Sequence, residues 1–231
     1  MRTLKVLGFL LTYPSAEHIE VLPECREILR REKWLPDTAL GSLDRLMEWM
    51  EGQDLLDLQE EYVALFDRTP SLCLHLFEHI HGDSRDRGQA LVDLHNIYKE
   101  AGLLITTDEM PDYLPLFLEY LSVLAPKEAQ ENLGNAINVI GALGQRLKNR
   151  ETPYASVFEA LVEAAGRKPD SKAVEEAIQE ASGALRSFEE MDEEWKEQFA
   201  FENTPQTTGQ DSGCPKAAEM LERMNLPREG K

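Results

Sequence analysis

The chemically most suggestive short pattern in the chain is His75-Leu76-Phe77-Glu78-His79, which matches the H-x-x-E-H signature of inverted zinc peptidases. On a helix this spacing would set two imidazoles one turn apart, with Glu78 beside them as a general base. No downstream glutamate stands out as a third ligand, and the supporting sheet of a peptidase site is not predicted. A chance match is the favoured interpretation, with a zinc hydrolase using His75, Glu78 and His79 as the enzyme alternative.

The next segment, residues 82–88, has a charge arrangement that breaks a local rule. Asp83 can cap a following helix, but Arg85 and Arg87 would lie in the first turn of that helix. The positive end of the helix dipole disfavours cations there by about 0.3–1 kcal/mol. We therefore expect these arginines to have partners, either acidic residues of the chain such as Glu78 or a bound ligand.

Other catalytic and metal-binding patterns are missing from the sequence. It has no phosphate-binding loop, dinucleotide fingerprint, G-x-S-x-G elbow or paired E-x-x-H motif. The cysteines Cys25, Cys73 and Cys214 are too far apart to indicate a disulfide framework or a zinc knuckle. Cys73, in an apolar run, is expected to be a small core residue. We predict a protein that is not an enzyme and that holds no metal or cofactor.

The composition is that of a globular protein with a large acidic excess. The 231 residues include 43 Asp and Glu against 24 Lys and Arg, giving a formal net charge of -19. A negative field repels phosphate backbones and anionic lipid, so nucleic acids and membrane surfaces are not expected as partners. The same field favours a basic partner such as a cationic peptide, although solubility alone would also explain it.

The N-terminus imitates a signal peptide, with basic residues followed by an apolar stretch up to Leu11. Tyr13-Pro14 replaces the small-residue cleavage site, and Leu4, Leu7 and Leu10 share one helix face. We predict a first core helix, no insertion in a membrane and a cytoplasmic location.

Apolar residues recur at helical spacing throughout the chain, and strand-like alternation is scarce. Asp37 and Asp54 can serve as N-caps, Gly102 is a natural helix stop, and Thr152-Pro153 is typical of a helix start. The sequence predicts an all-α, single-domain helical bundle of roughly eight or more helices. The apolar stripes lie near residues 40–50, 55–66, 91–98, 133–147 and 158–165.

Two segments depart from this regular pattern. Residues 113–124 leave almost no polar face, so their helix is either buried all round or covered on one side by a ligand. Beyond an acidic run at 189–194, the Pro, Gly and Thr content is typical of a flexible tail. We predict a helical domain over residues 1–202 and a tail over residues 203–231.

Three stretches resemble the hallmarks of one family. They run from Tyr62 to Arg68, from Leu76 to Ala90 and from Met110 to Leu121. The second contains F-E-H-I-H-G-D-S-R-D-R-G, and the third has an acid–aromatic pair leading into L-E-Y-L. They closely resemble the NarJ-type nitrate reductase molybdenum cofactor assembly chaperones, of the broader TorD-like redox-enzyme maturation group. The resemblance extends from the N-terminus to about residue 165, and it makes His75 incidental, so that no metal is implied.

The resemblance implies a chaperone that binds the N-terminal segment of the apo catalytic subunit of nitrate reductase, and a second site on that subunit. Docking of that subunit on the membrane would wait until the molybdenum cofactor is inserted, and cofactor-insertion proteins are possible further partners. A sibling chaperone for another molybdoenzyme is the alternative. The expected peptide-binding residues come from the last two hallmarks: Phe77, Glu78, His79, Asp83, Arg85, Arg87, Asp112, Tyr113, Leu116, Phe117, Glu119 and Tyr120.

Overall fold

A computed structural model describes residues 1–81 and 85–178 of the chain. Within these residues the backbone is helical or forms connections, and the one strand-like feature is an isolated antiparallel bridge between His75 and Tyr113. The predicted all-α architecture is therefore confirmed. The α-helices are α1 (Arg2–Phe9), α2 (Ala16–Glu20), α3 (Leu22–Glu32), α4 (Asp37–Gly52), α5 (Leu55–Tyr62), α6 (Glu78–His81), α7 (Arg85–Glu100), α8 (Leu114–Val123), α9 (Pro126–Asn135), α10 (Ile137–Asn149) and α11 (Ala155–Ala165).

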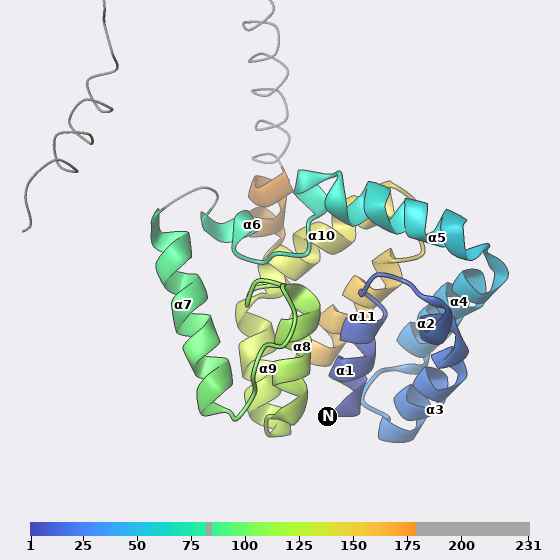
Figure 1. Cartoon of the computed structure of the whole chain (residues 1–231), viewed down its shortest axis with the longest axis horizontal. Coiled ribbons are helices and arrows are strands. Elements are labelled where there is room, and N and C mark those ends of the chain that lie inside the picture. Colours follow the sequence, from blue (N-terminus) through green and yellow to red (C-terminus); the bar gives the residue numbers. More distant parts are fainter. Residues whose placement is uncertain (82–84, 179–231) are drawn as a thin grey trace, which may run out of the picture. The chain divides into compact units, whose positions relative to one another are not determined.

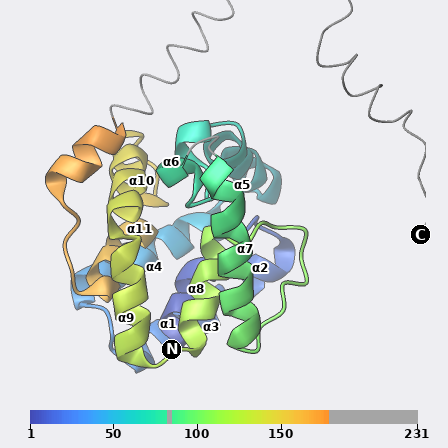
Figure 2. The same cartoon turned by 90° about the vertical axis from the view of Figure 1, so that its left-hand side faces the viewer.

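The helices are arranged so that α8 lies between α9 and α1, with α7 on the outer side of this layer (Figure 1). In both views α5 and α6 lie at the same end of the upright helices (Figure 2). Helix α1 packs against α8 and α3, and α11 packs against α10 and α4. The hallmark segments therefore lie at one end and along one side of a common core.

Helix α1 is a core element, as predicted. Leu4, Leu7 and Leu10 are fully buried, and burial of one such side chain stabilises a fold by about 1.5–3 kcal/mol. The beginning of the helix is held by Glu32 of α3, whose carboxylate accepts hydrogen bonds from the Arg2 and Thr3 backbone N–H groups at 2.9 and 2.8 Å. A cap from another helix thus takes the place of a local one.

Two glycines allow close approach of helices in this core. A Cβ atom on Gly8 of α1 would lie 3.2 Å from the Cβ of Leu118 in α8. A Cβ atom on Gly144 of α10 would lie 2.9 Å from the Cβ of Phe158 in α11, closer than real contacts allow. Close packing of these two helix pairs therefore requires glycine, which has no side chain, at both positions.

The predicted helix boundaries are right in part. Asp54 caps α5 by accepting a hydrogen bond from the Leu56 N–H at 2.9 Å, and Gly102 follows α7 with φ +79°. The prediction for Asp37 was wrong: it is the first residue of α4, and the N-cap position belongs to Pro36. Asp37 therefore adds negative charge in the first turn instead of a side-chain cap.

The helix expected around residues 133–147 is two helices. The chain turns at Ala136, with φ -93° and ψ 2°, between α9 and α10. The helix expected to start at Thr152-Pro153 starts two residues later, because the Ala155 N–H bonds the Thr152 carbonyl in a preceding turn. Residues 171–178 form a further helical segment.

Helix α8 is the over-apolar segment singled out in the sequence. Pro115, Leu118 and Leu121 are buried, whereas Phe117 is partly buried and Val123 is 56% exposed. Burial in the bundle thus accounts for most of its apolar surface. A partly covered strip remains on its outer side.

In the described ranges no helix is both long and apolar enough to span a membrane. Several predictions fall outside these ranges: those on Asp83, the acidic run at 189–194, Cys214 and the tail beyond residue 203. The side chain of Arg85 is likewise outside the description, although its backbone begins α7.

Candidate functional site

Two of the hallmark segments meet in a short antiparallel pairing. The Leu76 N–H donates to the Asp112 carbonyl at 3.0 Å, and the Leu114 N–H donates to the Leu74 carbonyl at 2.8 Å. These bonds flank the bridge between His75 and Tyr113. Residues 73–79 and 110–114 are called the junction below. Because the pairing fixes both backbones, the junction presents side chains from both hallmarks together.

Asp112 is the centre of the junction. It is fully buried, and its carboxylate accepts a hydrogen bond from the Phe77 N–H at 3.0 Å while lying 3.3 Å from Nδ1 of His75. Burial opposes ionisation of Asp112, but the bonds from His75 and Phe77 prevail and lower its pKa. The same hydrogen bond to Asp112 raises the pKa of His75. A hydrogen-bonded pair of His75 and the buried Asp112 thus joins the two segments.

A second polar group surrounds Glu78. The Cys73 thiol donates to one Glu78 oxygen at 2.8 Å, and Nη2 of Arg87 donates to the other at 2.8 Å. Burial, followed by the hydrogen bond to Glu78, raises the pKa of Cys73 to about 12, so the sulfur is a protonated donor. Cys73 is buried as predicted, and Arg87 has the partner within the chain that its place in the first helical turn predicted.

The H-x-x-E-H spacing does not produce the expected pair of imidazoles on one helix. His75 lies in the extended bridge, whereas Glu78 and His79 belong to α6. The His79 ring nitrogen Nε2 lies 2.9 Å from the Cys73 carbonyl oxygen. Among the residues that the structure describes, no group of three or more His, Cys, Asp or Glu side chains is placed to hold a metal ion.

The remaining predicted residues lie farther along α8. The Tyr120 ring packs 4.9 Å from that of Tyr98 in α7, between ring centroids, and the Phe117 ring is 6.5 Å from Tyr120. Glu119 forms an exposed ion pair with Lys5 of α1 at 2.7 Å. The predicted set therefore divides between the junction (Phe77, Glu78, His79, Asp112, Tyr113), Arg87 beside it, and an α8 strip (Leu116, Phe117, Glu119, Tyr120).

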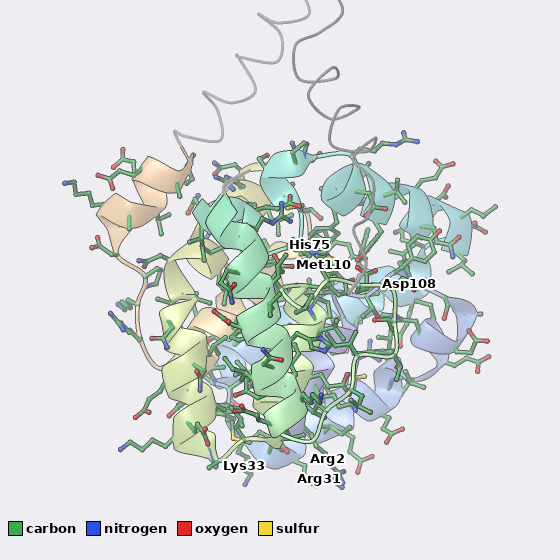
Figure 3. The ribbon with its side chains drawn as sticks, turned by 60° about the vertical axis from the view of Figure 1, so that its left-hand side comes forward. Arg2, Arg31, Lys33, His75, Asp108 and Met110 are labelled. Carbon is green, nitrogen blue, oxygen red and sulfur yellow. The ribbon has the colours of Figure 1, made fainter. Side chains whose placement is uncertain are left out.

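Sequence reasoning assigned no role to a pocket beside the junction. It has a volume of about 220 Å³ and is lined by Tyr13, Tyr62, Phe66, Asp67, Leu74, His75, Glu109 and Tyr113. Figure 3 shows Asp108 and Met110 on one loop, with His75, from the other segment, near Met110 in this view. The first hallmark, Tyr62 to Arg68, was the sequence feature that could have indicated this pocket. Its residues form the end of α5 and a π-helical turn, Val63–Asp67. Such turns are frequent at functional sites.

A wider hollow lies along α5, with a volume of about 770 Å³. It shares Tyr13 with the smaller pocket, and its lining includes the exposed Leu56 and the acidic Asp57 and Glu60. Apolar and acidic groups therefore stand side by side here, as they do at the junction.

Comparisons with known proteins identify the family of the chain. Residues 35–160 match the family model described as "Nitrate reductase delta subunit". The chain is 40% identical over 210 residues to a protein of Escherichia coli K12 named as the probable nitrate reductase molybdenum cofactor assembly chaperone NarW, covering 88% of this chain and 86% of that protein. It is also 40% identical over 178 residues to the nitrate reductase molybdenum cofactor assembly chaperone NarJ of the same strain, covering 77% and 75%.

A solved structure supports the fold. A putative redox enzyme maturation protein from Archaeoglobus fulgidus superposes with a TM-score of 0.53 at 20% identity, covering 72% of this chain and 94% of that one. Both relatives carry the name of an assembly chaperone, NarW with the qualifier "probable". On the family model and the two 40% identical relatives, the chain belongs to the nitrate reductase delta subunit family.

Proposed function

We propose that this protein is a chaperone for the assembly of a respiratory nitrate reductase. It binds the N-terminal segment of the apo catalytic subunit and holds that subunit until the molybdenum cofactor is inserted and the complex can dock on the membrane. The observation that carries this proposal is the 40% identity to two nitrate reductase molybdenum cofactor assembly chaperones over most of their length. The protein acts by binding and catalyses no reaction itself.

The proposed binding surface is the junction together with the α8 strip. Phe77, Leu116 and Phe117 are partly buried, so each has apolar area to offer to a partner. Glu78 and Glu119 lie at its edge with side chains 36% and 47% exposed, and each already has a cationic partner in the chain, Arg87 for Glu78 and Lys5 for Glu119, from which a basic segment would have to compete for the charge. Apolar contact would supply most of the affinity, and the acidic groups would orient a basic segment and speed its association.

Asp112 has a different part in this proposal. Its carboxylate is fully buried and already bonded to Phe77 and His75, so it is not available to a partner. We assign to it the positioning of residues 75–79 against Tyr113. Replacing Asp112 should therefore weaken binding through the shape of the junction.

The test is calorimetric titration of the full chain with a synthetic peptide of the N-terminal segment of the accompanying catalytic subunit. Glu119→Gln removes one surface charge, and we expect about 2–5-fold weaker binding, the equivalent of one exposed ion pair. Glu24→Gln on α3 is the matched control, because it removes the same charge from a helix outside the proposed surface. Phe117→Ala should weaken binding further, and its melting temperature is measured alongside.

No binding by the folded wild type at high micromolar peptide would refute the proposed function. Binding that is equal in Glu119→Gln, Phe117→Ala and the Glu24→Gln control would place the site elsewhere on the molecule.

A further inference from the structure

The pocket beside the junction has an unusual combination of walls. Tyr13, Tyr62, Phe66 and Tyr113 supply aromatic rings, and Asp67 and Glu109 supply carboxylates. The rings of Tyr13 and Tyr62 meet edge to face with centroids 5.5 Å apart, and Tyr62 and Phe66 are 5.0 Å apart. These walls come from four separated stretches of the chain, so the pocket exists only in the folded protein.

The hydrogen bonds of the tyrosines fix the walls in place. The Tyr62 hydroxyl donates to the Leu11 carbonyl at 2.9 Å, and the Tyr113 hydroxyl lies 3.1 Å from that of Tyr62. The donor capacity of Tyr62 is used within the chain, so Tyr113 is the donor in the second bond. Both rings are therefore preorganised, and an occupant need not satisfy their hydroxyl groups.

The charge in the pocket is negative and unpaired. Neither Asp67 nor Glu109 forms an ion pair with any residue in the described part of the chain. Apart from the tyrosine hydroxyls, the remaining titratable group is His75, which is bonded to the buried Asp112. The two carboxylates thus act on a space walled by aromatic rings, whose faces also attract positive charge.

Size and charge together restrict the occupant. Pockets for cofactors and drug-sized ligands are usually about 300–1,000 Å³, and this one is about 220 Å³. Asp67 and Glu109 are exposed, so an apolar side chain would gain nothing from their charge, and an anion would be repelled. A single cationic side chain fits all of these conditions. Among cations, a planar guanidinium both stacks on aromatic rings and forms forked bonds to carboxylates.

We propose that the pocket formed by Tyr13, Tyr62, Phe66, Asp67, Glu109 and Tyr113 receives one arginine side chain of the bound partner segment. This proposal rests on the proposed function for the identity of that segment. It adds a specific chemistry: the aromatic rings cover the guanidinium, and the two carboxylates neutralise it. The wider hollow along α5, lined by three acidic residues and by Arg68, shares Tyr13 with the pocket, so a basic segment bound in the pocket would lie beside it.

The first experiment tests the pocket without a client. The full chain is titrated with N-acetylarginine amide, with its neutral citrulline analogue and with N-acetyllysine amide, while the tyrosine ring signals are followed by NMR. We expect saturable shifts of the Tyr13 and Tyr113 signals with the arginine compound in the millimolar range, and binding of the other two at least about 5-fold weaker. Equal binding of the citrulline analogue or of the lysine compound would overturn the proposal.

Paired variants test the role of the carboxylates. Asp67→Asn combined with Glu109→Gln keeps the shape and removes both charges, and it should weaken binding of the arginine compound at least about 5-fold. The matched control is Asp37→Asn combined with Glu24→Gln, two exposed positions that do not line the pocket. The same affinity in both double variants would overturn the proposal.

Titration with the nitrate reductase segment then separates the two proposals. If the segment binds the wild type and the Asp67→Asn/Glu109→Gln variant equally, the pocket proposal fails and the proposed function stands. If the arginine compound saturates the pocket but the segment does not bind the wild type, the proposed function fails and the cation site stands.

Discussion

Different interactions hold together two regions of the molecule. One is the apolar core around α1, α8 and α11, and the other is the polar junction of residues 73–79 and 110–114. In the core, Leu4, Leu118 and Phe158 are fully buried, and glycines bring the helix backbones close. In the junction, a buried Asp112 binds a histidine and a backbone amide. Apolar contacts stabilise without strict direction, whereas buried hydrogen bonds and ion pairs require one geometry. The core thus supplies stability, and the junction supplies a defined arrangement of side chains.

The largest loss of stability is expected for a substitution in the apolar core. Phe158 is fully buried against Gly144, and Phe158→Ala should lower the free energy of unfolding by about 3–5 kcal/mol. For a domain of this size that corresponds to a fall in melting temperature of about 6–20 °C. Val123→Ala, at an exposed position on α8, is the control and should change stability by less than about 0.5 kcal/mol. Thermal unfolding followed by circular dichroism measures both.

A smaller loss is expected at the centre of the junction. Asp112→Ala removes the acceptor of the Phe77 N–H and the partner of His75, at a cost of about 2–3 kcal/mol. Chemical denaturation measures this loss, and hydrogen exchange should show faster exchange of the Phe77 amide. Asp93→Ala, an exposed position on α7, is the matched control. If Asp112→Ala were no more destabilising than this control, the junction would not be held by the buried carboxylate of Asp112.

The same contrast explains how much could be predicted from the sequence. Apolar periodicity predicted the helices and the burial of α1, because core packing follows directly from the spacing of leucines. It failed at Ala136, where one stripe continues across the turn between α9 and α10. One long helix and two shorter helices would bury the same apolar residues, so the apolar stripe cannot distinguish between them. Helix starts were missed by one or two residues for a similar reason: a polar residue near a start can fill the cap or the first turn.

The site was less predictable than the fold. The family resemblance pointed to residues 77–87 and 112–120, but spacing cannot reveal that Asp112 is bonded inward or that Glu78 is shared by Cys73 and Arg87. Asp112 meets its partners through the pairing of two segments more than thirty residues apart, whereas Arg87 reaches Glu78 from the following helix, α7. The pocket at Tyr13 and Tyr62 was missed because its walls come from separated stretches with no common periodicity.

The smallest expected effect compares two histidines, one in each environment. His18 is stacked on Phe9 with ring centroids 3.9 Å apart, and burial lowers its pKa to about 4. His75 in the junction has a raised pKa, because Asp112 accepts its hydrogen bond. The two residues should therefore give the folding equilibrium opposite dependences on pH.

The sign for His18 follows from its lowered pKa. Below about pH 6.5 the unfolded chain protonates this residue while the folded protein does not, until the pH approaches about 4. Between pH 7 and 5.5 this linkage should remove about 1 kcal/mol of stability. For His75 the folded protein binds the proton more tightly, so its contribution is fully present below about pH 6.5 and is lost as the pH rises through the folded-state pKa.

Two matched variants separate these contributions from the rest of the chain. Chemical denaturation at pH 7 and at pH 5.5 gives the change in unfolding free energy for the wild type, His18→Asn and His75→Asn. On acidification His18→Asn should lose about 1 kcal/mol less stability than the wild type, because the unfavourable protonation of His18 is gone. His75→Asn should lose more than the wild type, because the ion pair with Asp112 no longer forms. Both variants share the large acidic background, which cancels in each difference. If the two differences had the same sign, the protonation of His18 and of His75 would not have opposite effects on stability, and the contrast between core and junction would not extend to the charge of these two histidines.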